Sequence, residues 1–159
     1  MMIEPLHPLP PGLALDEQLC FALYAASRAM TGCYRPQLDG LGLTYPQYLV
    51  MLVLWEQHTV SVSRLSERLQ LSTGTLSPLL KRLETAGLLT RRRRADDERL
   101  VQLTVTQRGL DLMYHAAAAR AGVERTMGLS PTAIAELRDQ LHELTSRLRA
   151  AVEPHGQTA

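Results

Sequence analysis

The sequence predicts a mainly α-helical fold that carries one small β-hairpin. Helix-capping residues punctuate most of the 159-residue chain, as expected of successive helices. Only segments 88–93 and 100–106 have strand-like composition, and the mostly charged stretch between them is typical of a hairpin tip. The length corresponds to about one domain.

The first elements are an arm and a long helix. Residues 1–14 are rich in proline and are expected to form a flexible N-terminal arm. A helix is expected over about 15–39, with Asp16 as its N-cap and with Pro36 kinking or ending it. Gly40 then marks a loop.

Serine and threonine caps mark the starts of three further helices. These are 45–57 behind a Thr44–Gln47 capping box, a short helix to Leu69 that begins at Ser61 or Ser63, and a third from Ser72 that ends at Gly87. The hairpin follows, and the chain returns to helix from Thr106 to about Arg125.

The last helix begins at Ser130 and Pro131, an N-cap followed by proline at the first helical position. Its apolar residues alternate at spacings of three and four, which defines a continuous seam along one face. The seam consists of Ile134, Leu137, Leu141, Leu144 and Leu148. Two interpretations stay open for it, an intrachain core stripe and a dimer interface.

This order of elements is that of a winged helix-turn-helix, over about 44–106. Residues 61–110 carry ten Lys/Arg and five Asp/Glu, whereas the segments on either side are net acidic. A localised basic region of this kind favours nucleic-acid binding, with double-stranded DNA as the partner.

The candidate DNA-binding residues lie on the second helix of the turn and on the hairpin. The small hydroxyl side chains that open the helix suit base edges or phosphates: Ser72, Thr73, Thr75 and Ser77. Lys81 and Arg82 follow where phosphate contacts are expected. Arg91, Arg92, Arg93, Arg94 and Arg99 surround the hairpin tip and suit a narrow minor groove. The alternative for these arginines is a solvated charged hairpin.

Several motifs resemble the MarR family of regulators across about residues 15–150. They are Leu65…Leu69, Gly74-Thr75-Leu76, Leu83-Glu84-Thr85-Ala86-Gly87-Leu88-Leu89, Asp97-Glu98-Arg99 and Leu103-Thr104…Thr106…Gly109. The resemblance implies one MarR-type domain over 15–155 and a homodimer on a palindromic operator. It further implies that helices about 15–39 and 107–152 form the dimerisation body. Arg99 would enter the minor groove, oriented by Asp97.

Cys20 shares one helix face with two tyrosines. At 100° per residue, Tyr24 and Tyr34 each lie within about 40° of Cys20, whereas Cys33 lies on a different face. Cys20 and Tyr34 of one helix are about 21 Å apart, so they meet only if a partner helix runs antiparallel past the first. A tyrosine hydroxyl that donates to the sulfur stabilises the peroxide-reactive thiolate. Spacing alone leaves open an inert buried thiol.

The same region is similar to the organic hydroperoxide-responsive (OhrR) subfamily of MarR repressors. The similarity rests on Leu19-Cys20-Phe21-Ala22-Leu23-Tyr24-Ala25-Ala26-Ser27-Arg28, Tyr34-Arg35-Pro36 and Leu43-Thr44-Tyr45-Pro46-Gln47-Tyr48. The resemblance implies a redox sensor made of Cys20, Tyr24, Tyr34 and Tyr45. It also implies a repressor that releases DNA when an organic hydroperoxide oxidises Cys20.

The fate of oxidised Cys20 follows from the cysteine count. No cysteine lies beyond Cys33, so the subfamily's disulfide to a C-terminal resolving cysteine is not supported. A small cellular thiol is the expected resolving partner. A bridge from Cys20 to the partner's Cys33 stays open, with a passive thiol the favoured role for Cys33.

Other classes fit less of the sequence. A MarR-type regulator gated by a small-molecule ligand keeps the fold but leaves the cysteine–tyrosine set unused. A thiol peroxidase would use Cys20 but would not explain the helix-turn-helix. No catalytic residues, cofactor or metal site are expected, since the five histidines are scattered. The N-terminus lacks a signal peptide and no segment suits a membrane span, so a cytoplasmic protein with reduced thiols is expected.

Overall fold

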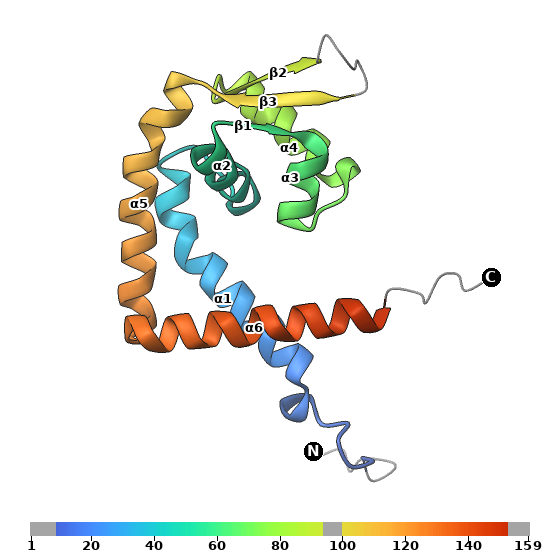
Figure 1. Cartoon of the computed structure of the whole chain (residues 1–159). Helices are drawn as coiled ribbons and strands as arrows, with labels where there is room; N and C mark the ends of the chain where they lie inside the picture. The colour runs from blue at the N-terminus through green and yellow to red at the C-terminus, as the bar shows by residue number, and fades with distance from the viewer. Residues whose placement is uncertain (1–8, 94–99, 153–159) are drawn as a thin grey trace, which may run out of the picture. The chain divides into compact units, whose positions relative to one another are not determined.

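The computed structural model describes residues 9–93 and 100–152 (Figure 1). Its elements are η1 (Leu15–Glu17), α1 (Leu19–Asp39), α2 (Tyr45–Gln57), β1 (Thr59–Ser61), α3 (Val62–Leu69), α4 (Thr73–Thr85), β2 (Leu89–Arg93), β3 (Val101–Val105), α5 (Gln107–Met127) and α6 (Pro131–Val152). The mainly α-helical winged helix-turn-helix expected from the sequence is confirmed. Residues 1–8 of the expected arm, and Arg94, Asp97 and Arg99 of the hairpin, lie outside the described residues.

The chain forms two compact units, one up to Val123 and one from Glu124 onward. The first unit contains a three-stranded antiparallel sheet in the order β1-β3-β2. In the β2–β3 hairpin Leu89 lies opposite Val105 and Arg93 lies opposite Val101. Strand β1 was not predicted, because a three-residue strand is too short to show alternation in the sequence.

The core of the first unit lies between α2, α4 and the sheet. Its fully buried side chains include apolar residues from each of these elements and from α3: Met51, Leu54, Leu65, Leu76, Leu80, Leu83, Leu89 and Leu103. Apolar burial of this kind stabilises the fold at roughly 25 cal/mol per Å². The core therefore fixes one face of α4 and leaves its opposite face to solvent.

Four of the predicted helix caps are confirmed. Thr44 and Gln47 form the reciprocal capping box, with distances of 2.8 and 3.4 Å. The hydroxyls of Ser61, Ser72 and Ser130 each accept a hydrogen bond from the backbone N–H three residues later, at 3.1, 3.2 and 3.1 Å. These bonds satisfy N–H groups that a helix start leaves unpaired.

The predicted N-cap at Asp16 is wrong. Asp16 lies within the short helix η1, and α1 begins at Leu19 with Gln18 as its N-cap. The Gln18 side chain donates to the carbonyl oxygens of Gly12 and Ala14, at 2.5 and 3.1 Å, and so folds the preceding turn back on itself. Helix α1 also continues three residues past Pro36, which therefore does not end it.

The second unit consists of the end of α5 and the whole of α6. None of the α6 side chains is buried, and Leu137, Leu141 and Leu148 of the predicted seam are 48%, 36% and 57% exposed. The seam is therefore no core stripe within the second unit. No helix among the described residues is long and apolar enough to span a membrane.

Candidate DNA interface and sensor residues

Helix α4 presents a polar face to solvent, opposite its buried leucines. All six predicted DNA-binding residues of this helix and its cap are exposed: Ser72, Thr73, Thr75, Ser77, Lys81 and Arg82. Helix α3 precedes α4 as the first helix of the turn (Figure 1). The arrangement leaves the N-terminal half of α4 free to enter a major groove.

The hydroxyls on this face are not equivalent. The Ser72 hydroxyl caps the helix and also lies 2.9 Å from the Thr75 hydroxyl. The hydroxyls of Thr73 and Ser77 have no hydrogen bond to any described residue. Thr73 and Ser77 are therefore available to a partner without loss of an internal bond, whereas Ser72 already serves the fold.

The arginines of strand β2 divide between the two faces of the sheet. Arg91 and Arg93 lie opposite Leu103 and Val101, and Arg92 lies opposite Gln102. Because side chains alternate along a strand, Arg92 faces away from the other two. Arg91 is engaged within the chain, since Glu84 of α4 accepts from its backbone N–H at 3.2 Å and from Nε at 2.8 Å. No ion pair holds Arg92 or Arg93 among the described residues.

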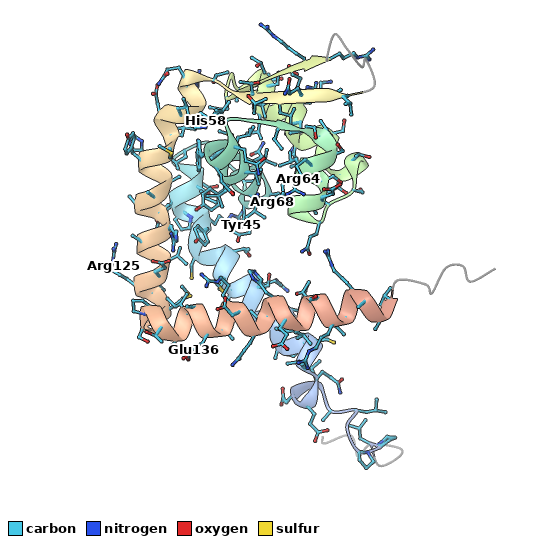
Figure 2. All side chains as sticks on the ribbon, in the orientation of Figure 1. Tyr45, His58, Arg64, Arg68, Arg125 and Glu136 are labelled. Carbon is cyan, nitrogen blue, oxygen red and sulfur yellow. The ribbon has the colours of Figure 1, made fainter. Side chains whose placement is uncertain are left out.

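Helix α3 contributes little free positive charge. Arg64 pairs with Glu67 at 3.1 Å, and Arg68 pairs with Glu56 of α2 at 2.8 Å (Figure 2). The Arg68 guanidinium holds the pKa of the Glu56 carboxyl below its usual value. The unpaired cations of the described helix-turn-helix therefore lie on α4 and on the wing, which is the hairpin of strands β2 and β3.

Cys20 is exposed as the second residue of α1. Tyr24, one turn later, is 58% exposed, and the Arg28 guanidinium lies 5.5 Å from the centre of its ring. Cys33 is also exposed. The first half of α1 is apolar yet has no fully buried side chain within the first unit, and Leu38 is the only buried residue of the helix.

Tyr34 and Tyr45 come together at the other end of α1. Their ring centres are 5.3 Å apart, and Tyr48 joins them at 5.5 Å from Tyr34 and 6.1 Å from Tyr45. Tyr45 opens α2 (Figure 2), and burial raises the pKa of its hydroxyl above the ordinary value for tyrosine. Sequence reasoning missed Tyr48, although its position one helical turn after Tyr45 signals a shared face.

One chain does not bring the whole predicted sensor together. Tyr34 lies fourteen residues after Cys20 on the same helix, so about 21 Å separates them along its axis. The structure thus joins Tyr34 with Tyr45 and leaves Cys20 with Tyr24 on a separate exposed stretch. Within the described ranges, no three His, Cys, Asp or Glu side chains gather as a metal site.

Comparisons with known proteins agree on the class. Residues 33–115 match a family model described as transcriptional regulator SarA/Rot. The chain is 43% identical over 136 residues to the organic hydroperoxide resistance transcriptional regulator of Bacillus subtilis, a match that covers 86% of this chain and 92% of that protein.

Two solved structures extend the likeness to the fold. The structure of reduced AbfR bound to DNA has a TM-score of 0.72 and 34% identity, and covers 87% of this chain and 96% of that one. AbfR comes from Staphylococcus epidermidis. AbsC, a MarR family transcriptional regulator from Streptomyces coelicolor, has a TM-score of 0.73 and 27% identity, with 87% and 97% covered.

The fold, the exposed recognition helix α4 and the relatives all indicate a regulator of transcription. None of these relatives is described as an enzyme. The chain belongs to the MarR family of DNA-binding transcriptional regulators, within its organic hydroperoxide-responsive branch.

Proposed function

We propose that this protein is a homodimeric repressor that binds an inverted repeat when Cys20 is reduced and leaves it when an organic hydroperoxide oxidises Cys20. The observation that carries the proposal is the separation of the sensor residues along α1. Cys20 and Tyr24 lie exposed at one end, and the Tyr34–Tyr45 pair lies at the other. One end has the thiol without the Tyr34 and Tyr45 hydroxyls, and the other end has those hydroxyls without the thiol.

A second copy supplies the missing half. If two α1 helices pair antiparallel with Cys20 of one beside Tyr34 of the other, the helices cross near Ser27, midway between these positions. Exposed apolar residues of α1, which include Leu19, Phe21 and Met30, would then lie at or beside the pairing surface. The exposed seam of α6 offers a second apolar surface to the same partner.

The pairing gives Cys20 hydroxyl donors. The Tyr24 hydroxyl comes from its own chain, and the hydroxyls of the partner's Tyr34 and the partner's Tyr45 complete the set. A hydrogen bond donated to the sulfur favours the thiolate over the thiol. The thiolate attacks one oxygen of the hydroperoxide, an S–O bond forms and the O–O bond breaks. The alkoxide that leaves takes a proton as an alcohol, and protonated Cys20 sulfenic acid remains.

Resolution consumes a small cellular thiol. The sulfur of that thiol attacks the sulfur of the Cys20 sulfenic acid, an S–S bond forms, and the hydroxyl leaves as water with the thiol proton. The bulky mixed disulfide has no place among the tyrosine hydroxyls. The α1 helices therefore shift, and the two recognition helices lose the spacing that the operator requires.

On DNA, each protomer would insert α4 into a major groove and its wing into the adjacent minor groove. Thr73 and Ser77 supply free hydroxyls for base edges or phosphates, with Thr75 and Ser72 beside them. Lys81, Arg82 and Arg93 are proposed to contact phosphates. By family resemblance, Arg99 enters the minor groove with Asp97 and Arg94 nearby.

The test is DNA binding across the redox cycle. A fluorescent duplex carrying the inverted repeat upstream of the protein's own gene is titrated with reduced dimer, then with cumene hydroperoxide and a small thiol. Wild type and Cys33→Ser are expected to bind and be released, whereas Cys20→Ser binds and stays. A Cys33→Ser protein that stays bound after oxidation would assign the resolving role to Cys33. Retention of DNA by oxidised wild type would contradict the redox mechanism.

A second candidate is gating by a small molecule. An open hollow of about 380 Å³ beside Tyr45 is lined by residues of α1 and the α1–α2 loop, with Arg28 and Arg35 as its cations. An anionic ligand bound there would release DNA from Cys20→Ser as readily as from wild type. The same titration with the serine variant therefore separates the two functions.

A further inference from the structure

A continuous run of aromatic rings leads away from the sensor tyrosines into the core. The Tyr34 ring contacts the Tyr45 and Tyr48 rings, and the Tyr48 ring lies 6.2 Å from that of Trp55, edge to face. Tyr48 is 3% exposed, so it cannot move without displacing its neighbours. The proposed sensor site is thus joined through packed rings to the C-terminal half of α2.

Trp55 continues the run with a hydrogen bond. Its indole Nε1 donates to the Gly109 carbonyl oxygen of α5 at 2.8 Å. These residues are 54 positions apart in the sequence, and the bond fixes the first turn of α5 against α2. A tryptophan N–H that is partly buried needs such an acceptor, because an unpaired donor is costly.

Gly109 is tightly packed against residues other than Trp55. A Cβ at this position would lie 2.3 Å from the Leu88 carbonyl oxygen and 2.7 Å from a methyl group of Val105. The glycine backbone is therefore in direct contact with the residue that precedes β2. A displacement of Gly109 is transmitted to Leu88 and Val105 since no gap separates them.

Leu88 lies at the joint between the recognition helix and the wing. Gly87 follows α4 with a positive φ of 73°, a backbone geometry that glycine adopts without strain. The Thr106 backbone N–H donates to the Leu88 carbonyl oxygen at 3.1 Å, and the Thr106 hydroxyl donates to that of Gly87 at 2.6 Å. Thr106, the residue that precedes α5, is therefore tied to both residues of the joint.

We propose that Trp55 is a positioning residue that couples the state of the tyrosine cluster to the orientation of α4 and the wing. This inference rests on the proposed redox function and names the route by which it acts. When Cys20 is oxidised, the tyrosine rings repack and the Trp55 ring follows them. The hydrogen bond from Trp55 then displaces Gly109, and the Gly87–Leu88 segment that joins α4 to β2 is displaced with it. The wing and α4 then move as one packed body.

Trp55 is the only tryptophan of the chain, so its fluorescence reports on this one position. We expect the emission of free wild-type dimer to shift on oxidation by cumene hydroperoxide and a small thiol. The emission of Cys20→Ser is expected to stay unchanged under the same treatment. An emission that does not change in wild type while DNA is released would overturn the proposal, because the ring would then be at rest during the transition.

A variant tests the coupling itself. Trp55→Phe keeps an aromatic ring against Tyr48 but loses the N–H that holds Gly109. Coupling is measured as the ratio of the operator Kd of oxidised to reduced protein, and we expect this ratio to fall about tenfold, with reduced binding within about threefold of wild type. The control is Leu52→Met on the same helix as Trp55, whose side chain is 40% exposed, and its ratio should equal that of wild type.

The outcomes separate the two proposals. Equal ratios for Trp55→Phe and wild type would overturn the role of Trp55 and leave the redox function standing. A wild-type ratio near one would refute the redox function, and the coupling role would fall with it. Should Trp55→Phe fold poorly, the emission measurement on wild type and Cys20→Ser still decides the question.

Discussion

Glu84 of the recognition helix α4 accepts two hydrogen bonds from Arg91 of the wing. The Arg91 backbone N–H donates one at 3.2 Å, and the Arg91 guanidinium donates the other at 2.8 Å. The two oxygens of the carboxylate are used separately, one for each contact. The pair fixes the first residues of β2 to the last turns of α4. Because both side chains are about a third exposed, the pair contributes under about 1 kcal/mol to stability. Because the pair joins α4 to the wing, we expect it to restrict the angle between them.

Arg91 and Arg93 are therefore expected to differ in salt dependence, although they lie on the same face of the wing. Arg93→Ala should reduce the slope of log affinity against log salt by about one, as for a lost phosphate contact. Arg91→Ala should weaken binding with the slope unchanged. Titrations of the operator at several salt concentrations measure both slopes. A reduced slope for Arg91→Ala would mean that Arg91 leaves Glu84 to contact DNA.

Ser72 and Ser77 allow a similar separation of fold from DNA contact. Ser72→Ala removes the α4 cap and should lower the free energy of unfolding by about 1 kcal/mol. Ser77→Ala removes a hydroxyl that has no hydrogen bond to any described residue, so stability should hold while operator affinity falls. Urea unfolding and operator titration of both variants check this. Equal unfolding free energies for the two variants would contradict the capping role.

Gly109→Ala is expected to be strongly destabilising, because its Cβ would lie 2.3 Å from a backbone oxygen that cannot give way. Overpacking of this kind costs about 1–3 kcal/mol, and a backbone obstacle places the cost at the upper end. Gly32→Ala is the matched control, since no atom lies within 4 Å of its added Cβ. In a helix it should be neutral or stabilising by up to about 1 kcal/mol. Thermal unfolding of both variants tests the contrast.

The Glu56–Arg68 pair predicts a dependence of stability on pH. Because Arg68 lowers the pKa of Glu56 below its ordinary value of 4.5, the contribution of the pair is present above that value. It is lost as the pH falls through the lowered pKa of the folded state. Unfolding midpoints of wild type and Glu56→Gln should therefore differ at neutral pH and converge in acid. High salt should shrink the neutral-pH difference, since the carboxylate is exposed. A constant gap at all pH values would rule out this origin.

The helix caps that the sequence predicts correctly depend on local chemistry. The caps at Thr44, Ser61, Ser72 and Ser130 depend on residues three positions apart, so the sequence alone reveals them. Asp16 has a side chain suited to capping, but Gln18 occupies the cap position of α1. The Gln18 side-chain amide donates to carbonyl oxygens as far away as that of Gly12. That competition depends on the path of the preceding turn, which no capping rule describes.

Contacts between distant elements were beyond sequence reasoning. The Trp55–Gly109 bond joins residues 54 positions apart, and Glu84–Arg91 crosses from a helix to a strand. The sequence placed Tyr34 and Tyr45 in one sensor through family resemblance, whereas their ring contact depends on how α1 packs on α2. Tyr48 lies in a quoted motif but was given no role there, and Trp55 lies in none. Only the packing joins the two residues to the sensor tyrosines.

Helix α1 buries a single side chain, Leu38, in its own chain. In the proposed pair, Cys20 gains two of its three hydroxyl donors only when a neighbour is present. Peroxide sensitivity would then increase with protein concentration, and a scarce, dissociated chain would be both unable to repress and slow to oxidise. Oxidation of Cys20 in either protomer would disturb an interface that both protomers share. One oxidised subunit would therefore suffice to release the operator.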